Sequence, residues 1–266
     1  MKYCFYALAV LAMLNVGCKG GKDDKTAQTE VPEEEPLPER FENDDLPKAA
    51  DELFDDFMYY FASNEELQRR RIVFPLPVDT GVVEEEKWQM DPFFTKAGEY
   101  TLIFDSSEQR EMVGDTAIST AIVEKIFLST DSISQYQFIR EDGRWRLTAI
   151  AQQPLNKNAN ADFLKFYYSF ANDSAFQQQS LNDEIEFTGP DPEDDFAMME
   201  GFITPGSWEA FAPELPNDTI YNIVYGKQNT RAKEKVFVIC GIANGQEIEL
   251  NFRKQRGQWK LTKLTE

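Results

Sequence analysis

The sequence predicts an α+β fold that is built twice along the chain. The main sign is a pair of similar stretches, residues 138–148 and 252–262, in which Phe, Gly, Trp, Leu and Thr recur at one constant spacing. In each stretch a glycine ends a polar turn and apolar residues alternate with polar ones, which is typical of a β-hairpin. In both halves helical patterns precede strand patterns, the order of α+β domains.

Length and charge exclude some classes of protein. The chain has 266 residues, 21 of them Phe, which is enough for two domains with real cores. Its net charge of −20 argues against nucleic acid as a partner, because phosphate binding needs a basic face. The same charge argues against docking on anionic lipid, and its simplest role is to keep the surface soluble.

The absence of histidine excludes further chemistry. Nucleophile systems that use Ser-His-Asp or Cys-His, and the usual zinc sites, need an imidazole that this chain lacks. We expect no cofactor, and any enzyme here would use carboxylates, Tyr, Lys or Arg. Cys240 lies in an apolar run and predicts a buried, inert thiol, without a disulfide framework.

The N-terminus predicts export. Lys2 precedes the apolar run 3–16, which reads as a secretory signal and is too short to span a membrane. The run ends in Leu14-Asn-Val-Gly17-Cys18, which resembles a bacterial lipoprotein signal, although Asn15 departs from the pattern. The resemblance implies that residues 1–17 are removed and that Cys18 is lipidated, so that the lipid anchor alone attaches the chain to the membrane. The alternative is an ordinary signal peptide that is cleaved elsewhere.

Residues 18–47 predict a disordered acidic tether, because they combine acidic residues and prolines with almost no hydrophobic periodicity. Lys22-Asp23-Asp24 resembles a surface-export tag of some Gram-negative lipoproteins. We therefore expect an outer-membrane lipoprotein on the cell surface, with the periplasmic face as the alternative.

The first half, residues 48–155, begins with helices. A helix is predicted from an apolar stripe at spacings of three and four, formed by Leu53, Phe54, Phe57, Met58 and Phe61. Ser63 predicts the capping box of a second short helix that ends at the basic residues 69–71. This triplet could instead hold an anion. Strands follow at 72–74, 100–104, 118–128 and 136–150, while 88–94 fits either a short helix or an edge strand.

The second half, residues 156–266, repeats this order. Its helix carries Phe163, Phe166, Tyr167 and Phe170, and Trp208 corresponds to Trp88. Strands are predicted at 185–187, 221–225, 236–239 and 247–252, before the hairpin that carries Trp259. We predict two tandem domains, each with its own helices on its own curved antiparallel sheet.

This element order resembles the nuclear-transport-factor-2-like (NTF2-like) fold, a cone-shaped α+β unit, and a tandem pair behind a lipoprotein signal resembles an uncharacterised family of bacterial lipoproteins. The resemblance implies a pocket between the first helix and the concave face of the sheet. Tyr and Trp suit such a pocket because they join an apolar face to one polar group, but core residues whose polar atoms reach the surface are the favoured alternative. The candidates are Tyr60, Trp88, Tyr100, Tyr168, Trp208 and Tyr225.

An enzyme in the manner of ketosteroid isomerases would need a carboxylate base and a hydroxyl donor in that pocket. Asp56 and Tyr60 lie one helical turn apart and could supply them. However, Asp55 and Asp56 flank the apolar stripe, where exposed charge is expected, and no residue matches that family's catalytic set one by one.

Two surface patterns remain. The acidic run with Asp191, Glu193, Asp194 and Asp195 could bind calcium, but it lacks the spacing of an EF-hand loop, and a solvated loop is the favoured alternative. Four short Asp-Ser/Thr-aliphatic sequences resemble the O-glycosylation signal of some exported bacterial proteins, although turns also favour these residues. Their hydroxyl residues are Thr116, Ser132, Ser174 and Thr219.

Together these observations predict a lipid-anchored extracytoplasmic protein that binds a small molecule, a glycan or a protein partner without catalysis. The alternative is a histidine-free isomerase or hydrolase that uses a pocket carboxylate and a Tyr.

Overall fold

The computed structural model of the chain describes residues 46, 48–191, 194–226, 228–242 and 244–266. The signal peptide, Cys18, the tether up to residue 45 and Glu193 lie outside the described residues. Their assignments stay predictions. None of the helices described has both the length and the apolar composition that a membrane crossing requires.

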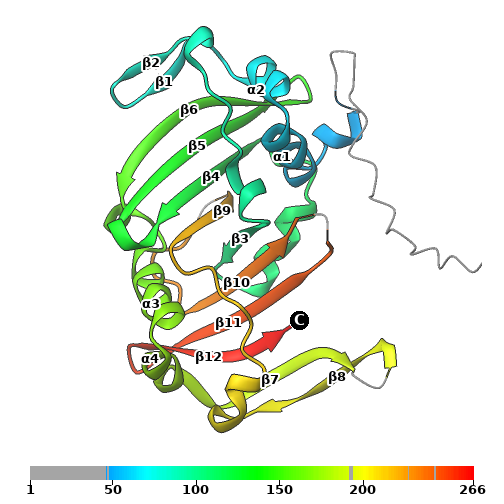
Figure 1. Cartoon of the computed structure of the whole chain (residues 1–266), viewed down its shortest axis with the longest axis vertical. Helices are drawn as coiled ribbons and strands as arrows, with labels where there is room; N and C mark the ends of the chain where they lie inside the picture. The colour runs from blue at the N-terminus through cyan, green and yellow to red at the C-terminus, as the bar shows by residue number, and fades with distance from the viewer. Residues whose placement is uncertain (1–45, 47, 192–193, 227, 243) are drawn as a thin grey trace, which may run out of the picture. The chain divides into compact units, whose positions relative to one another are not determined.

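The described part of the first half contains two α-helices, five short 3-10 helices and six strands (Figure 1). Asn64 caps α2 by accepting a hydrogen bond from the Leu67 amide at 3.0 Å. The capping box predicted at Ser63 is wrong, because α1 continues through Ser63 and turns its hydroxyl back to the Tyr59 carbonyl oxygen. The elements are α1 (Phe54–Ser63), α2 (Glu65–Arg71), β1 (Leu76–Val78), β2 (Gly81–Val83), β3 (Glu99–Phe104), β4 (Thr120–Phe127), β5 (Ser132–Glu141) and β6 (Arg144–Pro154).

The second half repeats this element order. Asp173 caps its second helix by accepting from the Ala175 and Phe176 amides. The elements are α3 (Ala161–Asn172), α4 (Ser174–Gln179), β7 (Leu181–Asp191), β8 (Asp194–Ile203), β9 (Thr219–Tyr225), β10 (Glu234–Gly241), β11 (Glu247–Gln255) and β12 (Gln258–Thr265).

The two predicted hairpins are β5–β6 and β11–β12, both antiparallel. Each turns through two residues with positive φ, Asp142-Gly143 and Arg256-Gly257, which is the backbone that a two-residue turn requires. Each then places its tryptophan against a phenylalanine in the first turn of the long helix. The ring centroids are 4.8 Å apart for Trp145 and Phe54 and 5.5 Å apart for Trp259 and Phe163.

A buried glutamine ties the helices to the rest of each half in the same way. Gln68 donates from Nε2 to the Phe61 carbonyl oxygen at 2.9 Å and accepts at Oε1 from the Trp88 indole at 3.1 Å. Because buried polar atoms need partners, this side chain fixes the end of α1 and the tryptophan together. The second half makes the same two contacts at 3.1 and 2.9 Å with Gln177, Phe170 and Trp208.

The strands form one sheet instead of the two that the sequence predicts. This sheet has 12 strands in the order β2-β1-β6-β5-β4-β9-β3-β10-β11-β12-β7-β8. Each strand of the first half has a counterpart six numbers later, so that β1 corresponds to β7 and β6 to β12. When every strand is replaced by its counterpart, the order read from one end equals the order read from the other end. The pairs β1·β6, β3·β9 and β7·β12 are parallel, and all the other pairs are antiparallel. The fold is therefore a mixed α+β arrangement with a large curved sheet and few helices (Figure 1).

The sheet is continuous because the halves exchange a strand. The neighbours of β3 are β9 and β10, both from the second half. The neighbours of β9 are β4 and β3, both from the first half. Each half therefore completes the hydrogen bonding of a strand that belongs to the other half.

Two hydrophobic cores lie on opposite faces of this sheet. On β10, Val236 and Val238 pack in the core that contains α1, whereas Phe237 and Ile239 pack in the core that contains α3. Successive side chains of a strand point to opposite faces, so the two helical layers cover opposite faces of the central strands. Residues 236–240 of β10 are consequently apolar on both sides, which is usual for strands buried between two layers.

Candidate functional site

A pocket lies beside α1, near the exchanged strands. Its volume is about 270 Å³. Two thirds of the chain separate the first and last elements that form it, so the strand exchange is what brings its walls together. The lining residues are Asp55, Asp56, Tyr59, Phe94, Tyr100, Ile223, Gly241 and Ile242.

A carboxylate and a phenol meet in this pocket. The Tyr100 hydroxyl on β3 donates to Asp55 Oδ2 on α1 at 2.9 Å. The other carboxylate oxygen, Asp55 Oδ1, is fully buried and has no hydrogen-bond partner among the described residues. A buried acceptor without a partner costs about 1–3 kcal/mol, so this oxygen marks a place where a donor from outside would be stabilising.

Burial changes the acidity of the groups in the pocket. Desolvation raises the pKa of Asp55 to about 6, the hydrogen bond from Tyr100 opposes the rise, and the nearby charge of Asp56 adds to it. Desolvation and the Asp55 charge raise the pKa of Tyr100. Desolvation also raises the pKa of the neighbouring Cys240 to about 12. Near neutral pH the phenol and the thiol are therefore protonated, while Asp55 lies close to its own titration.

The structure turns inward a different aspartate from the one that the sequence offers. It expects Asp55 to be exposed and offers Asp56 with Tyr60 as the acid–base pair. In the structure Asp56 is exposed, and Asp55 turns inward to meet Tyr100. The sequence does contain one indication, since Asp55 directly follows Phe54 of the apolar stripe in the first turn of α1. An inward-facing Asp55 could be predicted from this position only if the strand opposite α1 were known.

Tyr100 is the pocket candidate that the structure places in this cavity. Tyr60 is half-buried against the first core. Trp88 and Trp208 are core residues whose indole nitrogens bind Gln68 and Gln177. Tyr168 is 38% exposed.

Tyr225 lies in the opposite core from the one the sequence assigns to it. It is predicted as a pocket residue of the second half, but it packs in the first core, 6.1 Å from the Phe54 ring. The reason is the strand exchange, which carries β9 between β4 and β3. Its hydroxyl is buried without a partner among the described residues.

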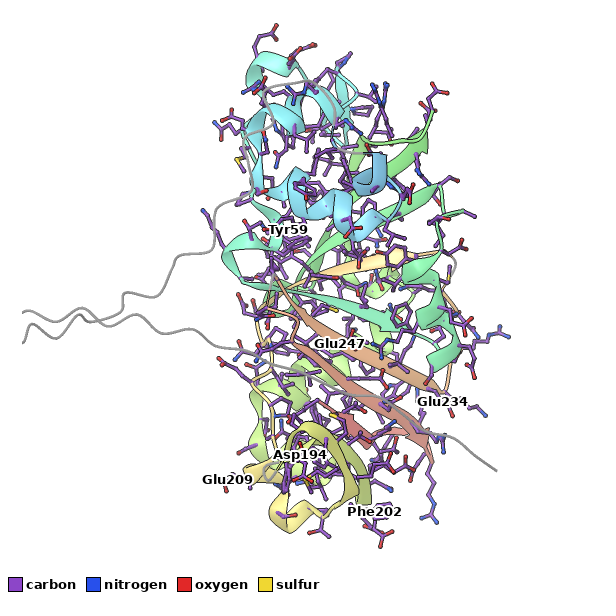
Figure 2. All side chains as sticks on the ribbon, turned by 90° about the vertical axis from the view of Figure 1, so that its right-hand side faces the viewer. Tyr59, Asp194, Phe202, Glu209, Glu234 and Glu247 are labelled. Atoms are coloured by element: carbon purple, nitrogen blue, oxygen red, sulfur yellow. The ribbon has the colours of Figure 1, made fainter. Side chains whose placement is uncertain are left out.

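The predicted acidic loop lies in the turn between β7 and β8. Figure 2 shows Asp194 on this hairpin, together with Phe202, which is 68% exposed. Among the described residues no group of three or more acidic or cysteine side chains could hold a metal ion. Asp191 ends β7, Asp195 follows Asp194 in β8, and Glu193 is not described.

The predicted glycosylation positions lie at element ends and in connections. Thr116 and Ser174 are exposed, and Ser132 and Thr219 are half-buried at the starts of β5 and β9. The Thr219 hydroxyl donates to Asp218 Oδ2 at 3.3 Å, and the Ser132 hydroxyl lies 3.0 Å from that of Thr130. Modification of these residues stays a prediction.

Comparison with known proteins places this geometry in a family. A family model described as "Domain of unknown function (DUF4348)" matches residues 33–266. The chain is also similar to the crystal structure of an NTF2-like protein from Bacteroides fragilis, with a TM-score of 0.75 and 40% sequence identity. That match covers 81% of this chain and 96% of the other chain. No curated protein sequence matches the chain.

Proposed function

The chain belongs to the DUF4348 family and has an NTF2-like fold, and from this premise we propose that it binds a small molecule in the pocket of Asp55 and Tyr100. We propose further that it is a tandem pair of NTF2-like units held outside the cytoplasm by a lipid on Cys18. Binding, not catalysis, is the proposed activity.

The unpaired oxygen of Asp55 carries the binding proposal. Its Oδ1 atom is buried beside the cavity, and a ligand hydroxyl or amine would supply the missing donor. Phe94, Ile223 and Ile242 give the pocket apolar walls. A pocket with apolar walls and few polar groups selects for shape and for one or two hydrogen bonds. The proposed ligand is therefore a compact, largely apolar molecule with one hydrogen-bond donor.

The tandem arrangement is supported by contacts that occur twice. The glutamine that binds a helix carbonyl and an indole, the capping residues Asn64 and Asp173, and the tryptophan hairpins recur in the same order. Chance would not repeat side-chain contacts of this kind across two unrelated segments. We accordingly propose units at about 48–155 and 156–266 that share one sheet.

The cellular location rests on the N-terminal sequence. The run that ends in Gly17-Cys18, and the acidic residues after it, support a lipid-anchored protein of the outer membrane. A Cys18→Ala variant tests this proposal, since it should leave the membrane pellet for the soluble fraction. Unchanged pelleting of that variant would remove the lipid anchor from the proposal.

A second candidate activity is proton transfer. A carboxyl with a pKa of about 6 next to a hydroxyl donor is the pair that an isomerase needs. In this pocket, however, the donor is hydrogen-bonded to the base itself. Tyr100 would have to leave Asp55 before it could stabilise a developing oxyanion, so the arrangement favours binding.

Native mass spectrometry of the full chain purified from membranes tests the pocket. We expect an additional mass of a small molecule that is retained by the wild type and lost in Asp55→Asn and in Tyr100→Phe. Glu52→Gln is the matched control, because it removes an exposed carboxylate close to α1 that does not line the pocket. Retention of the molecule in all three variants would contradict the proposed site. Release of a chemically changed molecule would favour the isomerase.

A further inference from the structure

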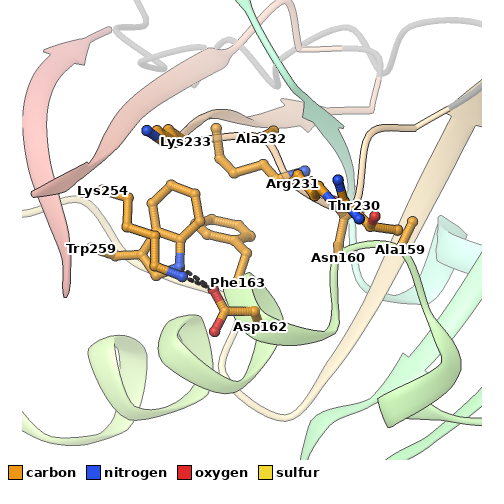
Figure 3. A pocket seen from close by; sticks show the side chains of 11 residues that line it. Ala159, Asn160, Asp162, Phe163, Thr230, Arg231, Ala232, Lys233, Lys254 and Trp259 are labelled. Atoms are coloured by element: carbon orange, nitrogen blue, oxygen red, sulfur yellow. Dashed lines mark hydrogen bonds and ion pairs between the residues drawn. The ribbon is translucent and has the colours of Figure 1, made fainter. Parts of the chain in front are cut away.

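A second cavity of about 270 Å³ lies at the N-terminus of α3, away from the Asp55 pocket. Figure 3 shows Asn160, Thr230 and Arg231 at one end and Asp162, Lys254 and Trp259 at the other. The connection before β10 forms one wall and the aromatic rings of Phe163 and Trp259 form another. The remaining lining residues are Ala159, Ala232, Lys233 and Lys235.

This cavity is basic although the chain is strongly acidic. Four of its side chains are cationic and one, Asp162, is anionic, and the buried ammonium group of Lys235 is also ion-paired with Asp105. Lys254 and the Trp259 indole bind Asp162 Oδ2 at 2.7 and 2.9 Å and thereby satisfy it. Arg231 and Lys233 are exposed and form no ion pair with a described residue. A concave surface of this charge attracts anions even when the protein's net charge is −20.

A buried donor in the cavity lacks a partner. Asn160 is only 1% exposed; its Oδ1 accepts from Lys235 Nζ, and its Nδ2 has no partner among the described residues. Asn160 is also the N-cap residue of α3, and its side chain makes no capping hydrogen bond. The backbone N–H groups in the first turn of the 12-residue helix α3 therefore lie next to the unpaired side-chain amide of Asn160. Together these donors favour a negative charge at this place.

The first half shows what fills the corresponding place there. Asp51 precedes α1 as Asn160 precedes α3, and it is held by Arg71 through two hydrogen bonds of 2.8 and 2.9 Å. The Trp145 amide also donates to this carboxylate. In the second half the carboxylate is replaced by the neutral amide of Asn160, and Ser180 stands where α2 has Arg71. The first half thus has a built-in carboxylate at the point where the second half has the unpaired amide donor of Asn160. Arg231 and Lys233 are the cations of this cavity that have no ion-pair partner among the described residues.

We propose that this cavity binds the anionic group of a small molecule, a carboxylate, sulfate or phosphate, at Asn160 and Arg231. The rest of that molecule lies against the rings of Trp259 and Phe163. This site is independent of the Asp55 pocket, and the two proposals can succeed or fail separately.

Calorimetric titration of the full chain tests the proposal. Inorganic phosphate, sulfate and acetate are titrated separately, with sodium chloride keeping the ionic strength constant. We expect saturable binding of at least one of them, weakened about tenfold or more by Arg231→Glu, because a charge-assisted contact becomes a repulsion. The anion that binds most tightly identifies the anionic group of the proposed ligand.

Two further variants complete the test. Asn160→Asp is nearly isosteric and places a carboxylate where the first half has Asp51, so it should abolish anion binding; thermal unfolding checks that it still folds. Lys87→Glu changes the net charge equally at an exposed site in the first half, and should bind as the wild type does. Absence of saturable binding for all three anions, or equal affinity in Arg231→Glu and Lys87→Glu, would overturn the proposal.

Discussion

The helices α1 and α3 occupy equivalent places but present different chemistry to the sheet. At the second position of α1 stands Asp55, with one oxygen bonded to Tyr100 and one unpaired. The corresponding residue of α3, 109 positions further along the chain (55 + 109 = 164), is Leu164, which is fully buried in the second core. The aromatic and amide contacts that dock the helices are repeated, whereas the buried charges are not. The shared contacts maintain the frame, and the differences assign a separate site to each half.

The largest expected effect comes from breaking a contact that both halves share. Trp145→Ala removes a fully buried ring and should cost about 3–5 kcal/mol of unfolding free energy. Because β9 and β3 each lie between strands of the other half, we expect the second half to lose protection as well. Chemical denaturation followed by limited proteolysis with mass spectrometry measures both effects. Trp259→Ala should behave alike, and cleavage confined to the mutated half would show that the halves unfold independently.

The next effect tests the difference at the starts of the helices. Arg71→Ser copies the residue of the second half and leaves the buried Asp51 without its cation, which should cost about 3 kcal/mol. The double variant Asp51→Asn with Arg71→Ser should recover much of that loss, since it removes the uncompensated charge. Arg70→Ser, next to it in a largely solvated i,i+4 pair, should cost about 0.5 kcal/mol. Denaturation midpoints compare all three, and a double variant no better than Arg71→Ser would contradict the explanation.

The smallest effect concerns the titration of Asp55. Its folded pKa of about 6 lies above its ordinary value of 3.8, so the folded state binds a proton more tightly than the unfolded state does. The contribution of this group to stability therefore falls as the pH rises from 3.8 to about 6, and stays low above that range.

Asp55→Asn removes this dependence. At about pH 8 the variant should be more stable than the wild type by about 1–2 kcal/mol, and near pH 4 the two should be nearly equal. Thermal unfolding across this range gives the difference between them. Glu52→Gln, which removes an exposed carboxylate outside the pocket, should keep the pH dependence of the wild type. A constant difference between wild type and Asp55→Asn at every pH would contradict the assignment of the shift to burial.

Local patterns in the sequence predicted the local structure. The apolar stripe around Phe57 predicted α1, and Gly143 and Gly257 predicted the two hairpins. The similar sequences around Trp145 and Trp259 predicted similar surroundings for the two rings, and each ring packs against a phenylalanine of the long helix. These features depend on residues close together in the chain, where periodicity and turn chemistry act directly.

The pairing of distant strands could not be predicted in this way. Thr101 lies beside Asn222 across the exchange, and no local pattern specifies a neighbour so far along the chain. The inward direction of the Asp55 side chain depends on that pairing too, because its hydrogen-bond partner Tyr100 lies on β3. The hairpin of β7 and β8 was partly missed, since β8 carries exposed Met198 and Met199 and lacks the alternation of a half-buried strand.

The exchange of β3 and β9 also fixes what a shortened gene could encode. A product that ends near residue 155 would keep β3 but lose both of the strands that pair with it. A product that starts near residue 156 would keep β9 and lose both of its neighbouring strands. Either piece could complete its sheet only by borrowing from another molecule. Its assembly would then depend on the protein concentration. In the intact chain β3 and β9 are covalently linked, so each exchanged strand is always present at a high local concentration.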